Sequence, residues 1–326
     1  MLFAIIHRMV DMSEKRKTDN KNDTTRDAGS WSVTALLRGC IRLLPADAPQ
    51  FIYTKILRPW PLRQIANAIL RRIIPKTITI PEGVLYLNQN DPVVSGALLL
   101  GAYEAYFAEV FRAQLREGMT VLDIGANLGY YTLIASKSAG HVVAFEPESE
   151  NRALLNKTLT ENKRANVLVI DKGVSDAAGA GLLAIDPDNK GKHSLLPTSG
   201  SAQVEIQLTT VDDTLSAHNI GHVDLIKMDI EGWEGHAFLG MSALLARVHP
   251  TILFEFAPAR IAQAGKDPKV MLDALHDLGY QLSVIDEGGH RLVPIETTTA
   301  LVASLRGIDD YVNIIAMTAN NQVAHS

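Results

Sequence analysis

Short apolar runs alternate with helical patterns along the chain from Met119 onward. The runs are rich in valine, isoleucine, leucine and phenylalanine, and the segments between them repeat apolar positions at the three- to four-residue spacing of a helix. Such regular alternation is typical of a mostly parallel β-sheet covered by helices. We expect strands near residues 119–124, 141–145, 166–171, 223–229, 251–256, 280–285 and 311–316.

One insertion interrupts this alternation, and a different pattern precedes it. Residues 181–185 and 203–208 have the pattern of an inserted hairpin pair around the polar loop 186–201, which lies where a substrate would approach. Ahead of the sheet, residues 77–87 predict a short hairpin, and residues 93–116 predict one helix or two.

The chain before this sheet is expected to be an accessory region. Residues 1–30 have too little apolar content to offset the entropy of ordering, which predicts a disordered tail. Residues 31–96 predict helices, broken by prolines, followed by the short hairpin. Their basic stretch, residues 55–76, is interpreted as a solvated helix face, with membrane-surface or polyanion contact as the alternative. The sheet-bearing domain is expected over residues 97–326.

Composition and charge exclude several classes of protein. The chain is 47% hydrophobic and 21% charged, and no apolar run approaches the ~18 residues that span a bilayer. A net charge of −5 gives the whole molecule no electrostatic reason to bind nucleic acid. The single cysteine, Cys40, excludes an intrachain disulfide and a multi-cysteine zinc site. We therefore expect a soluble, cytoplasmic protein.

The sharpest chemical signal is the stretch VLDIGANLG, residues 121–129. A strand ends at Asp123 and turns through Gly125, so that the backbone can approach a ligand while helix amides point at it. A dinucleotide loop needs Gly-x-Gly-x-x-Gly, but its later glycine positions hold Asn127 and Tyr130, which disfavours NAD. The stretch matches instead the Asp-x-Gly-x-x-x-Gly pattern of class I methyltransferases, whose acidic residue suits the positively charged S-adenosylmethionine (SAM).

A second carboxylate supports the same cofactor. Glu146 falls at the end of the next expected strand, 21 residues after Gly125. A carboxylate at that point can accept hydrogen bonds from both ribose hydroxyls. A lone glycine-rich turn is common in α/β proteins, but two acidic residues at neighbouring strand ends favour SAM over the alternatives.

Seven motifs follow one another in order: Gly101–Glu104, Asp123–Thr132, Phe145–Pro147, Gly173–Asp176, Thr210–Asp213, Asp224–Gly232 and Phe254–Glu255. Together they resemble the FkbM family of mostly O-directed methyltransferases. The resemblance implies a Rossmann-like class I fold, with a seven-stranded, mostly parallel sheet and an antiparallel last strand. It also implies SAM as methyl donor and a hydroxyl acceptor on a sugar, glycan or natural product. The expected cofactor-binding residues are Asp123, Gly125, Asn127, Gly129, Tyr131, Thr132, Glu146, Pro147, Gly173 and Val174.

Three side chains are candidates for activating the acceptor, because an alcohol is a poor nucleophile until its proton is removed. Asp229 ends the fourth core strand at the edge of the sheet where ligands bind, although a helix N-cap is an equal interpretation. Glu255 ends an apolar run and either meets the substrate or pairs with Lys227. His193, in the inserted loop, is a third candidate base, with an inert surface histidine as the alternative.

Some alternatives stay open on sequence alone. Asp229 with Glu231, or with Asp171, is an alternative Mg²⁺ site, although a metal-free site is preferred. The competing functions are a nicotinamide-dependent oxidoreductase on the same fold and a non-catalytic SAM-binding or assembly protein. The expected partner is a small-molecule or glycan acceptor.

Overall fold

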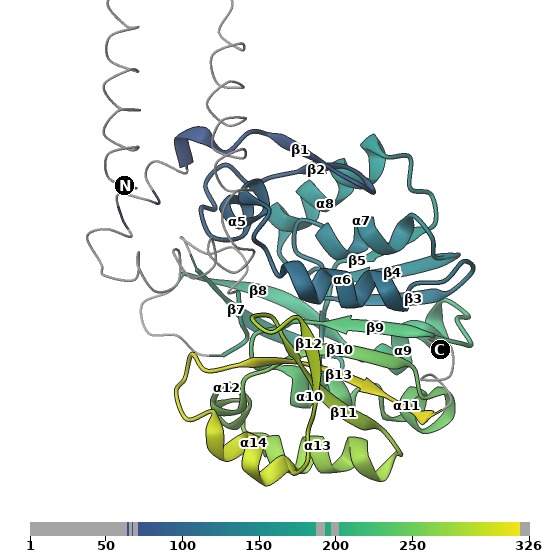
Figure 1. Ribbon diagram of the computed structural model, residues 1–326. Coiled ribbons are helices and arrows are strands. Elements are labelled where there is room, and N and C mark those ends of the chain that lie inside the picture. The colour runs from purple at the N-terminus through teal and green to yellow at the C-terminus, as the bar shows by residue number, and fades with distance from the viewer. Residues whose placement is uncertain (1–63, 65–66, 68–70, 187–192, 197–201, 320–326) are drawn as a thin grey trace, which may run out of the picture. The chain divides into compact units, whose positions relative to one another are not determined.

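The computed structural model describes residues 64, 67, 71–186, 193–196 and 202–319 (Figure 1). The chain divides into two compact units, residues 1–45 and 46–326, and every described residue belongs to the second. The tail predicted for residues 1–30 and the helices predicted up to residue 63 lie outside the described residues, so both stay predictions. Within the described part, no helix combines the length and apolarity needed to cross a bilayer.

An eight-stranded sheet lies at the centre of the second unit, with strand order β12-β11-β13-β10-β9-β3-β4-β5. Its strands are β3 (Thr120–Ile124), β4 (His141–Phe145), β5 (Val167–Ile170), β9 (Leu225–Met228), β10 (Thr251–Phe256), β11 (Gln281–Asp286), β12 (Arg291–Pro294) and β13 (Val312–Met317). Neighbours from β5 to β10 pair in parallel, whereas β13 runs antiparallel between β10 and β11. The predicted Rossmann-like fold, with its antiparallel last strand, is thereby confirmed.

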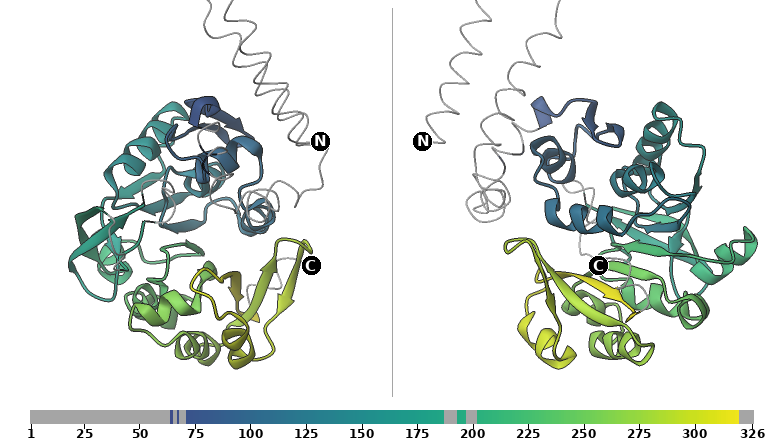
Figure 2. Two further views of the ribbon diagram at one scale, coloured as in Figure 1. Left: turned by 90° about the vertical axis from the view of Figure 1, so that its left-hand side faces the viewer. Right: turned by 45° about the vertical axis from the view of Figure 1, so that its right-hand side comes forward.

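The strand β12 is an addition to the seven predicted strands. It pairs with β11 in an antiparallel hairpin at the edge of the sheet, and Figure 2 shows this hairpin projecting from the sheet. The connecting turn is stabilised by Asp286, whose carboxylate accepts hydrogen bonds from the Gly289 amide (3.0 Å) and from Arg291 (3.1 Å).

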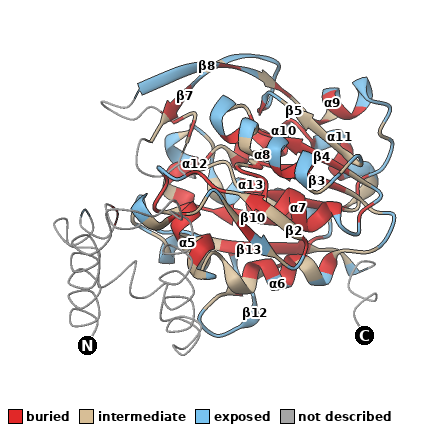
Figure 3. Ribbon diagram, turned by 90° about the horizontal axis from the view of Figure 1, so that it is seen from above, coloured by how far each residue is buried: buried red, intermediate tan, exposed pale blue. Residues whose placement is uncertain are grey.

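Helices cover both faces of the sheet because side chains alternate along each strand. On one face, residues such as Val121 and Val142 pack against α6 (Ala105–Gln114) and α7 (Tyr130–Ser136). On the other face, residues such as Leu122 and Ile226 pack against a second group of helices (Figure 1). These are α9 (Val211–Ala217), α10 (Glu234–Leu239), α11 (Ser242–Val248), α12 (Pro258–Gln263), α13 (Pro268–Asp277) and α14 (Thr298–Ser304). The central strands are accordingly buried (Figure 3).

The predicted short hairpin is present as β1 (Thr77–Ile80) and β2 (Gly83–Tyr86), and it is followed by α5 (Val94–Leu100). It packs on α8 (Ser149–Glu161) and the turn after it. Val84 donates its amide to the Asn162 side chain at 2.8 Å, and Tyr86 donates its amide to Thr158 at 3.1 Å. The hairpin and α5 therefore share a core with the helices beside the glycine-rich turn.

The predicted insertion forms a separate three-stranded sheet. β7 (Gly179–Ile185) and β8 (Ala202–Thr209) pair antiparallel, and the short strand β6 (Gly173–Val174) joins β8 in parallel. Residues 193–196 of the connecting loop are described. Ser194 bridges to Ala184 of β7, and its hydroxyl donates to the Glu231 carbonyl at 2.8 Å. These contacts hold the loop residue His193 near the carboxyl ends of the core strands.

Candidate active site

A cavity opens at the carboxyl ends of β3, β4 and β9, where ligands of α/β sheets bind. It is lined by the turns after these strands, by the inserted sheet and by the loop around His193. The space between its walls, including solvent at the open mouth, is about 840 Å³.

The turn after β3 requires its two glycines. Gly125 has φ +80°, and a Cβ atom there would lie 1.9 Å from the backbone oxygen of Asp229. Gly129 has φ +94°, and its Cβ would lie 2.5 Å from the Leu155 side chain of α8. Because no larger residue fits, the turns after β3 and β9 approach each other closely and form one floor of the cavity.

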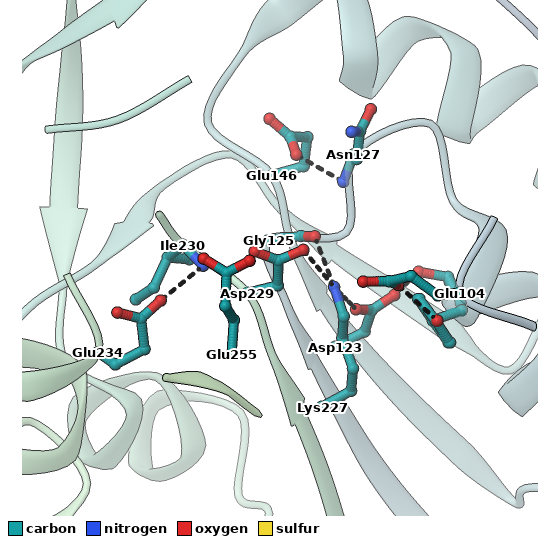
Figure 4. Close-up of polar contacts among 12 residues, drawn as sticks. Glu104, Asp123, Gly125, Asn127, Glu146, Lys227, Asp229, Ile230, Glu234 and Glu255 are labelled. Carbon is teal, nitrogen blue, oxygen red and sulfur yellow. Dashed lines mark hydrogen bonds and ion pairs between the residues drawn. The ribbon is translucent and has the colours of Figure 1, made fainter. Parts of the chain in front are cut away.

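Glu146 lies beside this turn and lines the cavity together with Pro147. One carboxylate oxygen accepts from the Asn127 backbone amide at 2.7 Å (Figure 4), and the other accepts from the Glu148 backbone amide at 2.9 Å. Burial raises the pKa of Glu146 to about 7. A carboxylate has about four acceptor positions, so two remain for hydroxyl donors of a ligand.

Three of the expected cofactor residues lie behind the cavity surface. Asp123 is fully buried, and Thr132 donates its hydroxyl to the Asp123 carboxylate at 2.5 Å. Gly129 shapes the turn without lining the cavity. The remaining expected residues, which do line it, are Gly125, Asn127, Tyr131, Glu146, Pro147, Gly173 and Val174.

Lys227, which the sequence suggested only as a partner of Glu255, lies at the centre of the polar end of the cavity. Its ammonium nitrogen is 3.3 Å from the Gly125 carbonyl, 3.8 Å from the Asp229 carboxylate and 3.9 Å from the Asp123 carboxylate (Figure 4). Burial alone would lower the pKa of Lys227, but the carboxylates of Asp229 and Asp123 outweigh burial and raise it. Lys227 therefore stays protonated, and its side chain is buried.

Tyr131 and Glu104 complete this polar end. The Lys227 ammonium lies 5.0 Å above the centre of the Tyr131 ring, and the Tyr131 hydroxyl donates to Glu104 at 2.7 Å. Glu104 precedes α6 with φ +42°, an uncommon backbone conformation for a non-glycine residue. Burial, and then the nearby Asp229 carboxylate, raise the pKa of Glu104 to about 7.

Glu255 is paired with Arg260, so the alternative pairing with Lys227 was wrong. The Arg260 guanidinium donates to Glu255 at 3.1 Å and also to Glu231. Burial, and then the Glu231 carboxylate, raise the pKa of Glu255 well above its usual range. Glu255 does not line the cavity. The pairing could not be found by pattern, because Arg260 lies on α12, beyond the strand.

Arg260 competes with Mg²⁺ for the carboxylates of the alternative metal site. Oxygens of Asp229, Glu231 and Glu255 lie within 4.8 Å of one another, a spacing that could hold a metal ion. The guanidinium of Arg260 already bonds two of these three carboxylates. Asp171, the other sequence candidate, is exposed and lies outside this group.

The opposite end of the cavity is apolar and is closed by the inserted sheet. Gly173 of β6 packs against Ile206 of β8 and faces Pro147. Trp233 lines the same cavity; its ring stacks on His236 at 4.0 Å, and its indole nitrogen donates to the Ser175 hydroxyl at 3.1 Å. This end suits a flat, weakly polar group such as a purine base.

His193 also lines the cavity, as predicted for a residue of the inserted loop. Its Nδ1 accepts a hydrogen bond from the Asp186 amide at 3.2 Å, so the ring is oriented by the end of β7. Asp229 lines the cavity too, and one of its carboxylate oxygens is buried with no hydrogen-bond partner among the described residues. Two of the three candidate bases thus meet at one cavity.

The successive surfaces of the cavity suit the successive parts of SAM. An apolar end suits adenine, Glu146 suits the ribose hydroxyls, and the charged end around Lys227 and Asp229 suits an amino acid group and a sulfonium. One carboxylate oxygen of Asp123 and one of Asp229 are buried without a hydrogen-bond donor among the described residues, which is consistent with a cationic ligand nearby.

Comparisons with known proteins agree with this assignment. Residues 123–282 match the family model described as methyltransferase FkbM domain. The hexuronic acid methyltransferase AglP of Haloferax volcanii is 26% identical over 157 residues, which cover 48% of this chain and 61% of that protein. The chain therefore spans about three fifths of the length of this curated relative.

Solved structures with related architecture include two methyltransferases. The crystal structure of methyltransferase FkbM from Methylobacillus flagellatus KT is 16% identical, with a TM-score of 0.40, and the match covers 81% of this chain and 60% of that one. A SAM-dependent O-methyltransferase from Thermotoga maritima is 12% identical with a TM-score of 0.37, covering 74% and 77% respectively.

The strand order and the glycine-rich turn define the Rossmann-like fold of class I methyltransferases, and the family match lies within this fold. More particularly, residues 123–282 of the chain are similar to the methyltransferase FkbM domain.

Proposed function

We propose that this protein transfers a methyl group from SAM to a hydroxyl of a sugar, glycan or other small molecule. The observation that carries the proposal is the position of Glu146, which lines the cavity beside the close turn at Gly125 and retains acceptor positions for ribose hydroxyls. When bound, SAM supplies an electrophilic methyl group on its sulfonium.

In this proposal, two sets of residues hold the donor. Gly125, Asn127, Glu146 and the apolar surface around Val174 contact it directly. The second set does not contact the donor but fixes the turn that makes those contacts; it consists of Asp123, Gly129 and Thr132. Positioning is the main requirement, since orienting two reactants can lower a barrier by ~7 to 11 kcal/mol.

Asp229 is the proposed base. It lines the cavity, directly follows β9 at the ligand-binding edge, and one of its carboxylate oxygens has no hydrogen-bond partner among the described residues. Asp229 takes the hydroxyl proton as the acceptor oxygen forms its bond to the methyl carbon and the carbon–sulfur bond breaks. General bases contribute roughly 10²- to 10⁴-fold. His193 is the second candidate, and Glu255 is proposed to support the site through Arg260.

An acidic sugar is the acceptor class to test first. The relative from Haloferax volcanii is named as a hexuronic acid methyltransferase, and its match covers 48% of this chain. We propose uronic acid residues of a glycan or glycoside as acceptors, with neutral sugars as the comparison.

The test has a binding arm and a transfer arm. Calorimetry should detect binding of S-adenosylhomocysteine (SAH), the demethylated product, and no binding of NAD. Methyl-labelled SAM should then label a glucuronide in preference to the matching glucoside, and Asp229→Asn should remove most of the transfer. Binding of NAD alone would support the oxidoreductase alternative, and SAH binding without transfer to any acceptor would support the non-catalytic one.

A further inference from the structure

Lys227 is a buried cation whose hydrogen-bonding capacity is largely unused. Its residue is 3% exposed, and an ammonium group has three donors. The Gly125 carbonyl, at 3.3 Å, is its hydrogen-bond acceptor among the described residues. The carboxylates of Asp229 and Asp123, at 3.8 and 3.9 Å, attract the charge but are too distant for hydrogen bonds.

A charge in this position needs short contacts. Burying an ammonium costs several kcal/mol unless hydrogen bonds and opposite charge compensate it. The carboxylates keep Lys227 ionised, so the cost is not avoided by losing the proton. Two donors remain for a ligand at the cavity surface, where Lys227 lies.

A cation is also unexpected beside a sulfonium donor, because the two positive charges repel each other. Two carboxylates at almost equal distances would neutralise the ammonium, but they would not require its donors to face the cavity. An anionic ligand group explains both features: it satisfies the open donors, and it offsets the repulsion of the sulfonium.

We propose that Lys227 binds the carboxylate of the amino acid half of the methyl donor. This inference rests on the proposed function. The position of the ammonium selects this carboxylate over others, because Lys227 is bonded to Gly125, in the turn that separates it from Glu146 and the ribose end. The other source of a carboxylate is a uronic acid acceptor, and the experiment separates the two.

The experiment measures binding of three ligands by calorimetry. SAH carries the full amino acid, S-adenosylthiopropylamine lacks only the carboxylate, and 5′-methylthioadenosine lacks the whole amino acid group. The variants are Lys227→Met and, as the matched control, Lys172→Met. Lys172 lines the same cavity next to its apolar end, but its side chain is exposed.

In the unmodified protein we expect SAH to bind roughly 10- to 100-fold more tightly than the amine, as hydrogen bonds to a charged group allow. Lys227→Met should reduce this preference to about one, and it should strengthen binding of the amine, which then meets Asp123 and Asp229 without a competing cation. Binding of 5′-methylthioadenosine should change little. Lys172→Met should keep the SAH preference.

The inference is overturned if Lys227→Met weakens SAH and the amine equally, since Lys227 would then be a structural neutraliser. It is also overturned if the variant keeps the SAH preference but loses the preference for glucuronide over glucoside, which would assign the contact to the acceptor. Thermal unfolding checks that the variant is folded. If it is not, Lys227→Met combined with Asp229→Asn removes both charges, and the same ratio of SAH to amine decides.

Failure of this inference differs from failure of the proposed function. If the unmodified protein binds none of the three nucleosides, the methyl donor assignment fails. If it binds SAH and the amine equally well before any substitution, the donor assignment stands and only the role of Lys227 is lost.

Discussion

The close approach of two turns at Gly125 makes a quantitative prediction. In Gly125→Ala, the new Cβ would lie 1.9 Å from the Asp229 carbonyl, far inside the 3.4 Å at which ordinary contact begins. The two turns must then move apart by more than an ångström. Gly118 provides the matched control, because it has the same φ of +80° but open space around its Cβ position.

The control separates two costs. An alanine in the left-handed region costs about 1 to 2 kcal/mol, which Gly118→Ala should show alone. Gly125→Ala adds backbone displacement of about 1 to 3 kcal/mol, for a total of about 2 to 5 kcal/mol. Since a misplacement of ~1 Å can lower a rate ~10²-fold, methyl transfer should fall by about that factor in Gly125→Ala only.

Urea unfolding gives the free energies, and calorimetry with SAH gives the binding loss. Gly118 lies before β3, at the end of the strand opposite the cavity, so its variant should bind SAH normally. Equal losses of stability in the two variants, or normal SAH binding by folded Gly125→Ala, would refute the reasoning.

Three further predictions concern the cavity and the carboxylates beside it. Burial raises the folded-state pKa of Glu146 from 4.5 to about 7, so its contribution to stability is lost as pH rises between these values. The affinity for SAH should instead rise as Glu146 ionises. Scanning and titration calorimetry across pH should show that stability and SAH affinity both depend less on pH in Glu146→Gln. Arg260→Met leaves Glu231 and Glu255 without their guanidinium and should lower the free energy of unfolding by about 3 to 5 kcal/mol. Mg²⁺ should raise the melting temperature of this variant but not that of the unmodified protein. The activity of the unmodified protein should survive chelators. Trp233 is one of three tryptophans in the chain, and it lines the cavity. In a variant with the other two replaced by phenylalanine, SAH should still change the tryptophan fluorescence. An unchanged spectrum would place the adenine elsewhere.

The core strands were predictable because they are buried and apolar. The sequences of β3 and β10 are mostly apolar, each with one carboxylate, and their observed bounds differ from the expected ones by at most one residue. β12 was missed for the opposite reason. All of its residues are exposed, so no burial pattern marks it in the sequence, and its pairing follows from the turn that Asp286 stabilises.

The residues of the candidate site were predictable where they lie at the ends of strands. Asp123, Glu146 and Asp229 each follow an apolar run, and parallel strands bring their carboxyl ends to one edge. The pairing of Arg260 with Glu231 and the hydrogen bond from Tyr131 to Glu104 join residues 29 and 27 positions apart. Such contacts depend on how helices pack on the sheet, which no local pattern encodes.

The excess of carboxylates in the site favours a positively charged ligand. The polar end gathers more carboxylates than cations, and burial holds the pKa of Glu104 and of Glu146 at about 7. Before a ligand binds, protons relieve this excess negative charge, because an unpaired buried carboxylate is costly. A donor with a net positive charge can take the place of those protons. The same excess would reject an anionic dinucleotide, so the electrostatics and the missing second and third glycines of the dinucleotide motif disfavour that ligand by independent means.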